Sequence, residues 1–183
     1  MASPTQRYVA LLRGVNVGGK HKLPMATFRE ALAEAGFANV STYIQSGNAI
    51  VSTSLAFSRV ETQLVQVLST RFALDVPVVV REAQAWSELM RANPFADEAN
   101  SEPNRVQLLL SRAAPAAGVE LALQPYAIHG ERIVNTGDAL WVHYPGGIRD
   151  SKLVPTVLDR CVGAPVTARN WRTVSKLQEL LSR

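Results

Sequence analysis

Residues 8–25 read YVALLRGVNVGGKHKLPM and contain the first change of structure along the chain. Tyr8 to Leu12 is a short apolar run that predicts a β-strand, and the glycine-rich residues 14–22 predict a loop after it. Beyond this loop Pro24 suits the first turn of a helix, because proline lacks the N–H that a helix start leaves without an intrahelical acceptor. The stretch therefore predicts a strand, a loop and a helix, in that order.

The next residues predict three more strands and a second helix. Ser58 and Glu61 match a capping box, which predicts the start of the second helix at Ser58. Pro77 lies near the start of the last strand and favours an edge position for it, since proline cannot donate to a β-ladder. The strands are predicted at residues 40–44, 49–52 and 76–80. Residues 1–82 thus have the order βαββαβ, which is typical of two helices on one face of an antiparallel sheet.

The same order returns near the C-terminus. Residues 85–92 predict a short helix, and the polar residues 97–104 predict a linker. Strands are then expected at 106–110, at 126–129 with 132–135 as one broken strand, at 139–144 and at 166–168, and helices at 114–123, after Ser151 and after Asn170. We therefore predict an α+β protein with an N-terminal βαββαβ half at 1–82, a short helix and linker at 83–104, and a second βαββαβ half with a terminal helix at 105–183.

Composition limits the class of protein. The 183 residues are 47% hydrophobic, and the net charge of +4 comes from fifteen Arg and four Lys against fifteen acidic residues. These positive charges are scattered, so charge alone does not indicate a nucleic-acid partner. Cys161 is the one cysteine, and no apolar run approaches the ~20 residues of a membrane span. We expect a cytoplasmic protein that does not enter membranes.

Gly14–Lys20 satisfies the spacing G-x-x-x-x-G-K of a nucleotide P-loop. His21 stands where that loop needs Ser or Thr for magnesium, Pro24 delays the helix, and Arg81 stands where a metal-binding Asp should end a later strand. We therefore do not expect an NTPase. An anion site remains open as an interpretation, beside a plain flexible loop; its candidate residues are Arg13, Gly14, Asn16, Gly18, Gly19, Lys20 and Lys22.

Three other polar segments have two interpretations each. Gln45, Ser46, Gly47 and Asn48 form either a plain hairpin turn or a contact to a ligand. Tyr144 with Ser151 and Lys152 either binds an anion at a helix start or simply caps that helix. Asn170 suits an N-cap, while Arg169 and Trp171 either clamp a ring or phosphate, or leave Trp171 in the core and Arg169 in solvent.

Hydrolytic and metal chemistry find little support in the sequence. His21, His129 and His143 fall in different elements without paired metal-ligand spacing, so we expect no metal and no cofactor. Cys161 falls on the apolar face of a helix and is expected to be a small core residue. No set of residues identifies a catalytic base.

Several of these motifs together resemble a bacterial family known as domain of unknown function 1697. They are Tyr8–Lys20, Leu23–Met25, Tyr43–Asn48, Asn93–Phe95, Tyr144–Pro145, Gly147, Ser151–Leu153 and Thr167–Trp171. Arg172 departs from the family, which often has Asn there. The resemblance implies two ferredoxin-like subdomains but no activity, substrate or cofactor.

Three functions remain as hypotheses. The favoured one is a binding module for a phosphate-bearing ligand, either a nucleotide or a short nucleic acid. A small enzyme acting on a phosphorylated substrate between the two halves, and a protein-interaction role, are the alternatives. The shared fold does not decide among them, because ferredoxin-like domains host many functions.

Overall fold

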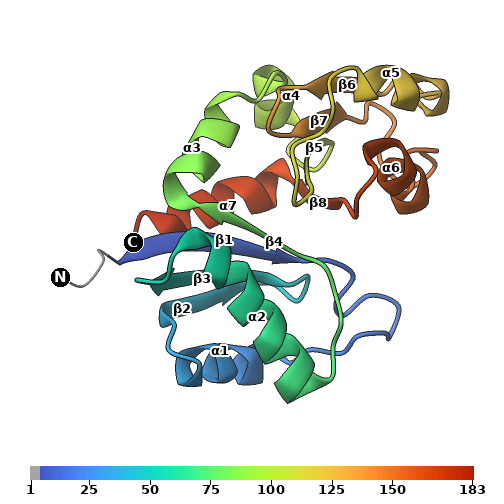
Figure 1. Cartoon of the computed structure of the whole chain (residues 1–183). Helices are drawn as coiled ribbons and strands as arrows, with labels where there is room; N and C mark the ends of the chain where they lie inside the picture. Colours follow the sequence, from blue (N-terminus) through green and yellow to red (C-terminus); the bar gives the residue numbers. More distant parts are fainter. Residues whose placement is uncertain (1–4) are drawn as a thin grey trace. The chain divides into compact units, whose positions relative to one another are not determined.

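The computed structural model describes residues 5–183, so the first four residues of the predicted N-terminal half lie outside it. It contains two four-stranded antiparallel sheets with helices, and both have ferredoxin-like connectivity, as predicted (Figure 1). An N-terminal unit comprises the chain up to Trp86 together with Leu177–Arg183, and a C-terminal unit comprises Ser87–Lys176. Each unit is a compact body with its own sheet.

The N-terminal sheet has the strand order β2-β3-β1-β4. Its elements are β1 (Gln6–Leu12), α1 (Met25–Glu34), β2 (Ala38–Tyr43), β3 (Asn48–Thr53), α2 (Phe57–Phe72) and β4 (Val78–Glu82). The central strand β1 pairs antiparallel with β3 and with β4, and β4 is the last strand in this order, so the predicted edge position is confirmed. A strand with neighbours on both sides has its backbone groups satisfied on both edges.

Side-chain alternation along β1 divides the sheet into two faces. Tyr8, Ala10 and Leu12 belong to the core that α1 and α2 cover, where Phe28 and Leu64 are fully buried (Figure 1). Arg7, Val9 and Leu11 therefore lie on the opposite face of the sheet. Helix α1 contributes Met25, Phe28 and Leu32 to this core, at the spacing of one helical face.

The predicted capping box at Ser58 is wrong. Helix α2 begins at Phe57 with Ala56 as its N-cap, and no side chain caps it. The hydroxyl of Thr53 instead accepts a hydrogen bond from Leu55 N–H at 3.2 Å, which turns the chain before the helix. This earlier turn starts the helix before Ser58 can occupy the cap position.

The C-terminal sheet repeats the arrangement with the order β6-β7-β5-β8. Its elements are α4 (Ala96–Ser101), β5 (Val106–Leu110), α5 (Val119–Leu123), a 3₁₀ turn (Gln124–Tyr126), β6 (Arg132–Asn135), β7 (Leu140–His143), α6 (Pro155–Val162) and β8 (Thr167–Asn170). Helices α3 (Ala83–Arg91) and α7 (Trp171–Leu181) run through the boundaries between the two units.

Several predictions for this half are wrong. The expected linker contains α4, whose first turn carries Asp97 and Glu98, which suit a helix N-terminus. The expected helix at 114–123 begins only at Val119, because Gly118 adopts a left-handed φ of 80° at its N-cap. Residues 126–129 form no strand, since the 3₁₀ turn Gln124–Tyr126, which contains Pro125, extends to Tyr126.

Gly47 offers a test of how closely the turn before β3 packs. Its φ is +76°, and an added Cβ would lie 2.5 Å from Val15 Cγ2 and 2.8 Å from Leu12 Cβ. Gly36 has a φ of +91° with open space around it, so it is the matched control. We expect Gly47→Ala to lower the free energy of unfolding by about 3 kcal/mol and Gly36→Ala by about 1 kcal/mol, measured by denaturant unfolding. Equal losses would mean that the turn yields to the methyl group.

Candidate functional site

The glycine-rich loop at residues 14–22 is held in place by the side chain of Asn16. Its Nδ2 donates to the Leu23 carbonyl at 2.9 Å and to the Gln45 carbonyl at 2.8 Å, and its Oδ1 accepts from Leu23 N–H at 2.8 Å. Asn16 itself has a φ of 56°, a left-handed conformation that Asn tolerates better than most residues. One side chain thus joins this loop to the turn at residues 45–48.

Backbone contacts strengthen the same junction. Leu12 N–H donates to the Gly47 carbonyl at 2.7 Å, which fixes the turn to the end of β1. Asn48 is fully buried, and its Nδ2 donates to the Tyr43 carbonyl and to Ser46 Oγ, each at 3.0 Å. The structure therefore brings together two segments that the sequence separates, and we call residues 14–22 and 45–48 the paired loops.

The outer part of the paired loops carries the positive charge. Val17 through Lys22 are all exposed, including Lys20 and Lys22. Gly18 and Gly19 both have left-handed φ values, and within residues 5–183 no acceptor takes their N–H groups. Lys20 N–H donates to the Val17 carbonyl at 3.1 Å, which closes the tip into a tight turn.

Two other residues define the edges of this region. His21 Nδ1 lies 3.1 Å from the Gly14 carbonyl, so its imidazole folds back over the loop. Arg13 is half-buried and its N–H donates to the Pro77 carbonyl at 3.0 Å, which makes it part of the strand end. The predicted N-terminal candidates are thus in one region, with the lysines outermost.

Ile44, next to the turn, has an unusual backbone conformation. Its φ is 50° although it is β-branched, and its side chain is 51% exposed. Such a conformation costs about 1–3 kcal/mol and persists only where the surroundings impose it. Val17, next to Asn16 in the other loop, is 63% exposed. Val17 in one loop and Ile44 directly before the other therefore present apolar side chains to solvent.

Ser151 and Tyr144 lie beside a carboxylate that sequence reasoning missed. Ser151 Oγ donates to Glu131 Oε1 at 2.5 Å, and His129 N–H donates to Glu131 Oε2 at 2.8 Å. Burial by itself would raise the pKa of Glu131, but the hydrogen bonds from Ser151 and the backbone outweigh it, and the pKa is lowered. Burial, and then the nearby charge of Glu131, raise the pKa of Tyr144. Glu131 is therefore held as a buried anion.

Ser151 does not cap a helix, contrary to the prediction. Its Oγ accepts from Leu153 N–H at 3.2 Å, and α6 begins later, at Pro155, with Val154 as N-cap. Lys152 is exposed but lies before the helix start. The Ser151 hydroxyl donates its hydrogen to Glu131 and so holds the loop. It is therefore not free to bind an anion.

The three candidates Arg169, Asn170 and Trp171 differ in their contacts and in how far they are buried. Asn170 Oδ1 accepts from Thr173 N–H at 2.9 Å, so the predicted N-cap of α7 is confirmed. Arg169 is not solvated: it is 9% exposed, its Nη1 donates to Thr167 Oγ1 at 2.9 Å, and burial lowers its pKa to about 10. Trp171 is half-buried, with its ring 5.9 Å from that of Trp141.

Sequence reasoning also missed a cluster of side chains around the buried His143 in the C-terminal unit. His143 is 7% exposed and lies directly opposite Arg132, whose Nη2 is 3.3 Å from its Nδ1. Arg132 forms an ion pair with Glu98, and its guanidinium lies 4.9 Å from the centroid of the Phe95 ring. Burial, and then the charge of Arg132, lower the pKa of His143. Sequence reasoning could not find this cluster, because residues 97–104, which include Glu98, were expected to be a linker.

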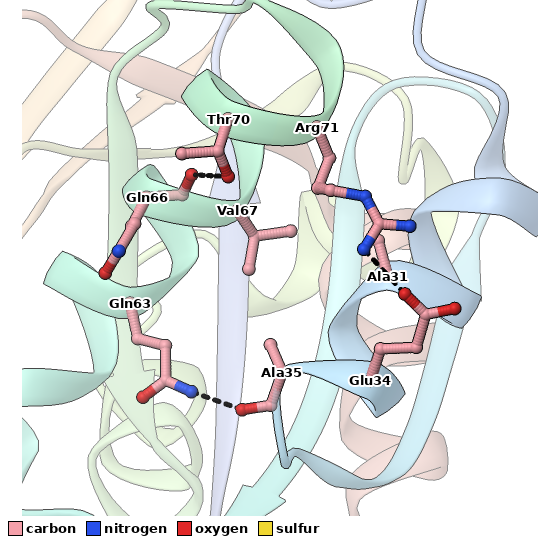
Figure 2. Close-up of a pocket in the computed structure, with 8 residues that line it drawn as sticks. All are labelled: Ala31, Glu34, Ala35, Gln63, Gln66, Val67, Thr70 and Arg71. Atoms are coloured by element: carbon pink, nitrogen blue, oxygen red, sulfur yellow. Dashed lines mark hydrogen bonds and ion pairs between the residues drawn. The ribbon is translucent and has the colours of Figure 1, made fainter.

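A groove of about 290 Å³ lies between α1 and α2 (Figure 2). The small residues Ala31 and Ala35 leave this space between the helices. At one place Arg71 Nη1 pairs with Glu34 Oε2 at 2.6 Å, and at another Gln63 donates to the Ala35 carbonyl (Figure 2). The polar groups of the groove thus serve one another and bind the two helices together, so the paired loops remain the better candidate.

Comparison with known proteins adds the family. A family profile described as "Protein of unknown function (DUF1697)" matches residues 5–141. The chain belongs to this family. The resemblance drawn from the N-terminal motifs is thereby confirmed, while the motifs from Tyr144 onward lie beyond the matched residues.

A solved structure supports the fold of this DUF1697 protein. The conserved bacterial protein SP0830 from Streptococcus pneumoniae matches with a TM-score of 0.76 and 20% identity, over 97% of this chain and 99% of that chain. The small subunit of acetolactate synthase from Thermotoga maritima matches with a TM-score of only 0.23 and 13% identity, over 90% of this chain and 96% of that one. A search of curated proteins finds no significant match.

The part of this DUF1697 protein that the structure describes shows neither a metal-ligand cluster nor a membrane-spanning helix. Among residues 5–183, no three His, Cys, Asp or Glu side chains are grouped so that they could hold a metal ion. No helix in the described part of the chain has the length and apolar character needed to cross a membrane.

Asn16 is the first residue to test in this DUF1697 protein. We expect Asn16→Gly, which keeps the left-handed backbone accessible, to lower the free energy of unfolding by about 2 kcal/mol through its lost hydrogen bonds. Amide hydrogen exchange should become faster at Leu23 N–H, which loses its acceptor, by a larger factor than at Phe28 N–H inside α1, which keeps its acceptor and responds only to the global stability. Unchanged exchange at Leu23 would show that the loop keeps its shape without the Asn16 side chain.

The surroundings of His143 predict that the stability of the folded chain depends on pH. Because the pKa of His143 is lowered in the folded state, the unfolded chain takes up the proton first as the pH falls below its usual 6.5. The stability of the folded chain should therefore decrease on acidification from pH 7 towards the folded pKa. The measurement is denaturant unfolding across this range, with His143→Gln expected to flatten the slope. A slope that the substitution leaves unchanged would contradict this assignment.

Proposed function

We propose that this protein binds a phosphate-bearing ligand, a nucleotide or a short nucleic acid, at the paired loops of its N-terminal unit. The observation that carries the proposal is the side chain of Asn16, which joins Gln45 and Leu23 through three hydrogen bonds. A loop fixed in this way keeps its donors in place before a ligand arrives, which reduces the entropy lost on binding.

The chemistry of the outer surface suits an anion. Lys20 and Lys22 are exposed, and neither loop contains an acidic residue to compete for them. The N–H groups of Gly18 and Gly19 are available to a ligand, and consecutive backbone N–H groups in a turn are a common way to bind phosphate. Two ammonium groups and two amides are enough for one phosphate.

The apolar side chains extend the proposal beyond plain phosphate. Val17 and Ile44 are each more than half exposed, one in the glycine-rich loop and one beside the turn. A ligand with an apolar or planar part next to its phosphate, such as a nucleotide, would cover both kinds of surface. The strained φ of Ile44 supports a functional reason for its placement.

Binding, and not hydrolysis, is the activity we propose. Residues 14–22 and 45–48 contain no carboxylate and no cysteine, and His21 is their one imidazole. General acid–base catalysis would need a base beside the ligand, and His21 Nδ1 lies against the Gly14 carbonyl. We propose that this binding takes place in the bacterial cytoplasm, where a chain with the single cysteine Cys161 would stay reduced.

The test is a thermal-shift titration with inorganic phosphate, nucleoside mono-, di- and triphosphates, and short RNA and DNA. A ligand at ~100 times its Kd stabilises by about 2.7 kcal/mol, which for a chain of this size raises Tm by roughly 5–10 °C. Lys20→Ala and Lys22→Ala should each weaken binding about five- to tenfold, since each removes one phosphate contact of about 1 kcal/mol.

Arg59→Ala is the matched control, because Arg59 is an exposed cation in α2 of the same unit and outside the paired loops. It should leave the affinity unchanged. If no member of the panel shifts Tm, or if Arg59→Ala weakens binding as much as Lys20→Ala does, the assignment of the paired loops is refuted.

A further inference from the structure

A second polar pocket lies in the N-terminal unit, away from the paired loops and at the other end of the strands. It has a volume of about 400 Å³ and is lined by Thr5, Arg7, Asn39, Ser52 and Arg183. Two guanidinium groups, two hydroxyls and one amide therefore surround it, and no acidic side chain lines it. This set of groups suits an anion, because guanidinium pairs with carboxylate and phosphate oxygens.

The strand register accounts for the pocket. Arg7 of β1 lies directly opposite Ser52 of β3, and both lie on the face of the sheet that is opposite α1 and α2. The register of β2 shifts between Ala38 and Ser41, and within this bulge Asn39 has a φ of 49°. The bulge directs the Asn39 amide to Ser52 Oγ, at 3.4 Å. The three strands thus supply a row of polar side chains.

Arg7 is the cation whose charge is least compensated in this row. Its Nη1 and Nη2 donate to the carbonyls of Leu181 at 2.6 Å and Leu180 at 3.1 Å, at the C-terminus of α7. A helix C-terminus offers only about half a negative charge. Within residues 5–183 no carboxylate pairs with Arg7, and its buried Nε–H has no acceptor. Partly buried charges are normally paired, so this one lacks a partner.

We propose that this pocket is a binding site for a small oxyanion, the carboxylate or phosphate group of a small molecule. Arg183 and the Ser52, Asn39 and Thr5 side chains would contact the oxyanion, while Arg7 supplies the uncompensated charge behind them. The site is independent of the proposed function of the paired loops, because it shares no residue with them and lies at the opposite ends of β1 and β3.

The experiment is an NMR titration of the ¹⁵N-labelled full chain with sodium phosphate and, separately, with sodium acetate, at constant ionic strength. We expect saturable shifts of the backbone amides of Asn39 and Ser52 and of the Arg7 Nε–H. Saturation with one anion only identifies the class of ligand, and saturation with both means that the shared oxyanion chemistry is recognised; either result supports the site.

Variants separate this site from the paired loops. Arg183→Ala, at an exposed residue, should weaken the binding seen at Ser52 about fivefold or more, and Arg59→Ala should not change it. The double variant Lys20→Ala, Lys22→Ala should leave it unchanged, so a failure of the paired loops would not hide this site. For Arg7 itself the variant is Arg7→Lys, which keeps the positive charge. Arg7→Ala is avoided, because it would also remove the hydrogen bonds from Arg7 to the C-terminal end of α7.

Two results would overturn the proposal. One is the absence of saturable shifts at Asn39, Ser52 and Arg7 with both anions. The other is binding whose affinity is the same in the Arg183→Ala and Ser52→Ala variants as in the natural sequence. Chemical shift changes at Gly18 and Gly19 alone would also overturn the proposal, since they would place all of the binding at the paired loops.

Discussion

The antiparallel register of β1 against β3 is the constraint on which the other features of the N-terminal unit depend. Ala10 lies opposite Ala49, and from that pairing the positions of both strand ends follow. At one end Leu11 meets Asn48, which places the turn at 45–48 beside the end of β1 and lets Asn16 reach Gln45. At the other end Arg7 meets Ser52. A slip of one residue would turn every core side chain of β1 to the wrong face, so the register is firmly specified.

The two units use the same connectivity but satisfy their buried polar groups differently. In the N-terminal unit, amide side chains such as Asn16 and Asn48 serve backbone carbonyls near a surface that stays open. In the C-terminal unit the polar groups serve charged neighbours: the buried Glu131 accepts from Ser151, and the exposed Arg132 lies between Glu98 and the buried His143. A buried charge such as Glu131 needs such a partner, and the Ser151 hydroxyl that serves it is not free for a ligand. This difference is why we assign binding to the N-terminal unit.

Periodicity in the sequence was sufficient to predict most of the fold. The central strand, the Gln45–Asn48 turn, the edge position of the last N-terminal strand and the N-cap at Asn170 all follow from local patterns. Predictions failed where the deciding interaction was distant or where a turn overrode a propensity. Helix α4 was expected to be a linker because its polar residues bury little, and its Glu98 is instead paired with Arg132 from a strand. Ser58 matched a capping pattern, but the turn at Thr53 began the helix earlier.

For the candidate sites the sequence alone determined which residue types were present: glycines that allow left-handed backbone, lysines without acidic neighbours, and an apolar strand before them. Local composition fixes these properties, because they belong to single residues and to their near neighbours. Only the tertiary structure decided that Asn16 would join two loops, that Ser151 would meet a buried Glu131, and that Arg7 would lie beside Ser52 and the end of α7. These contacts join residues distant in sequence, and the pairing of whole strands sets them, so no local pattern could contain them.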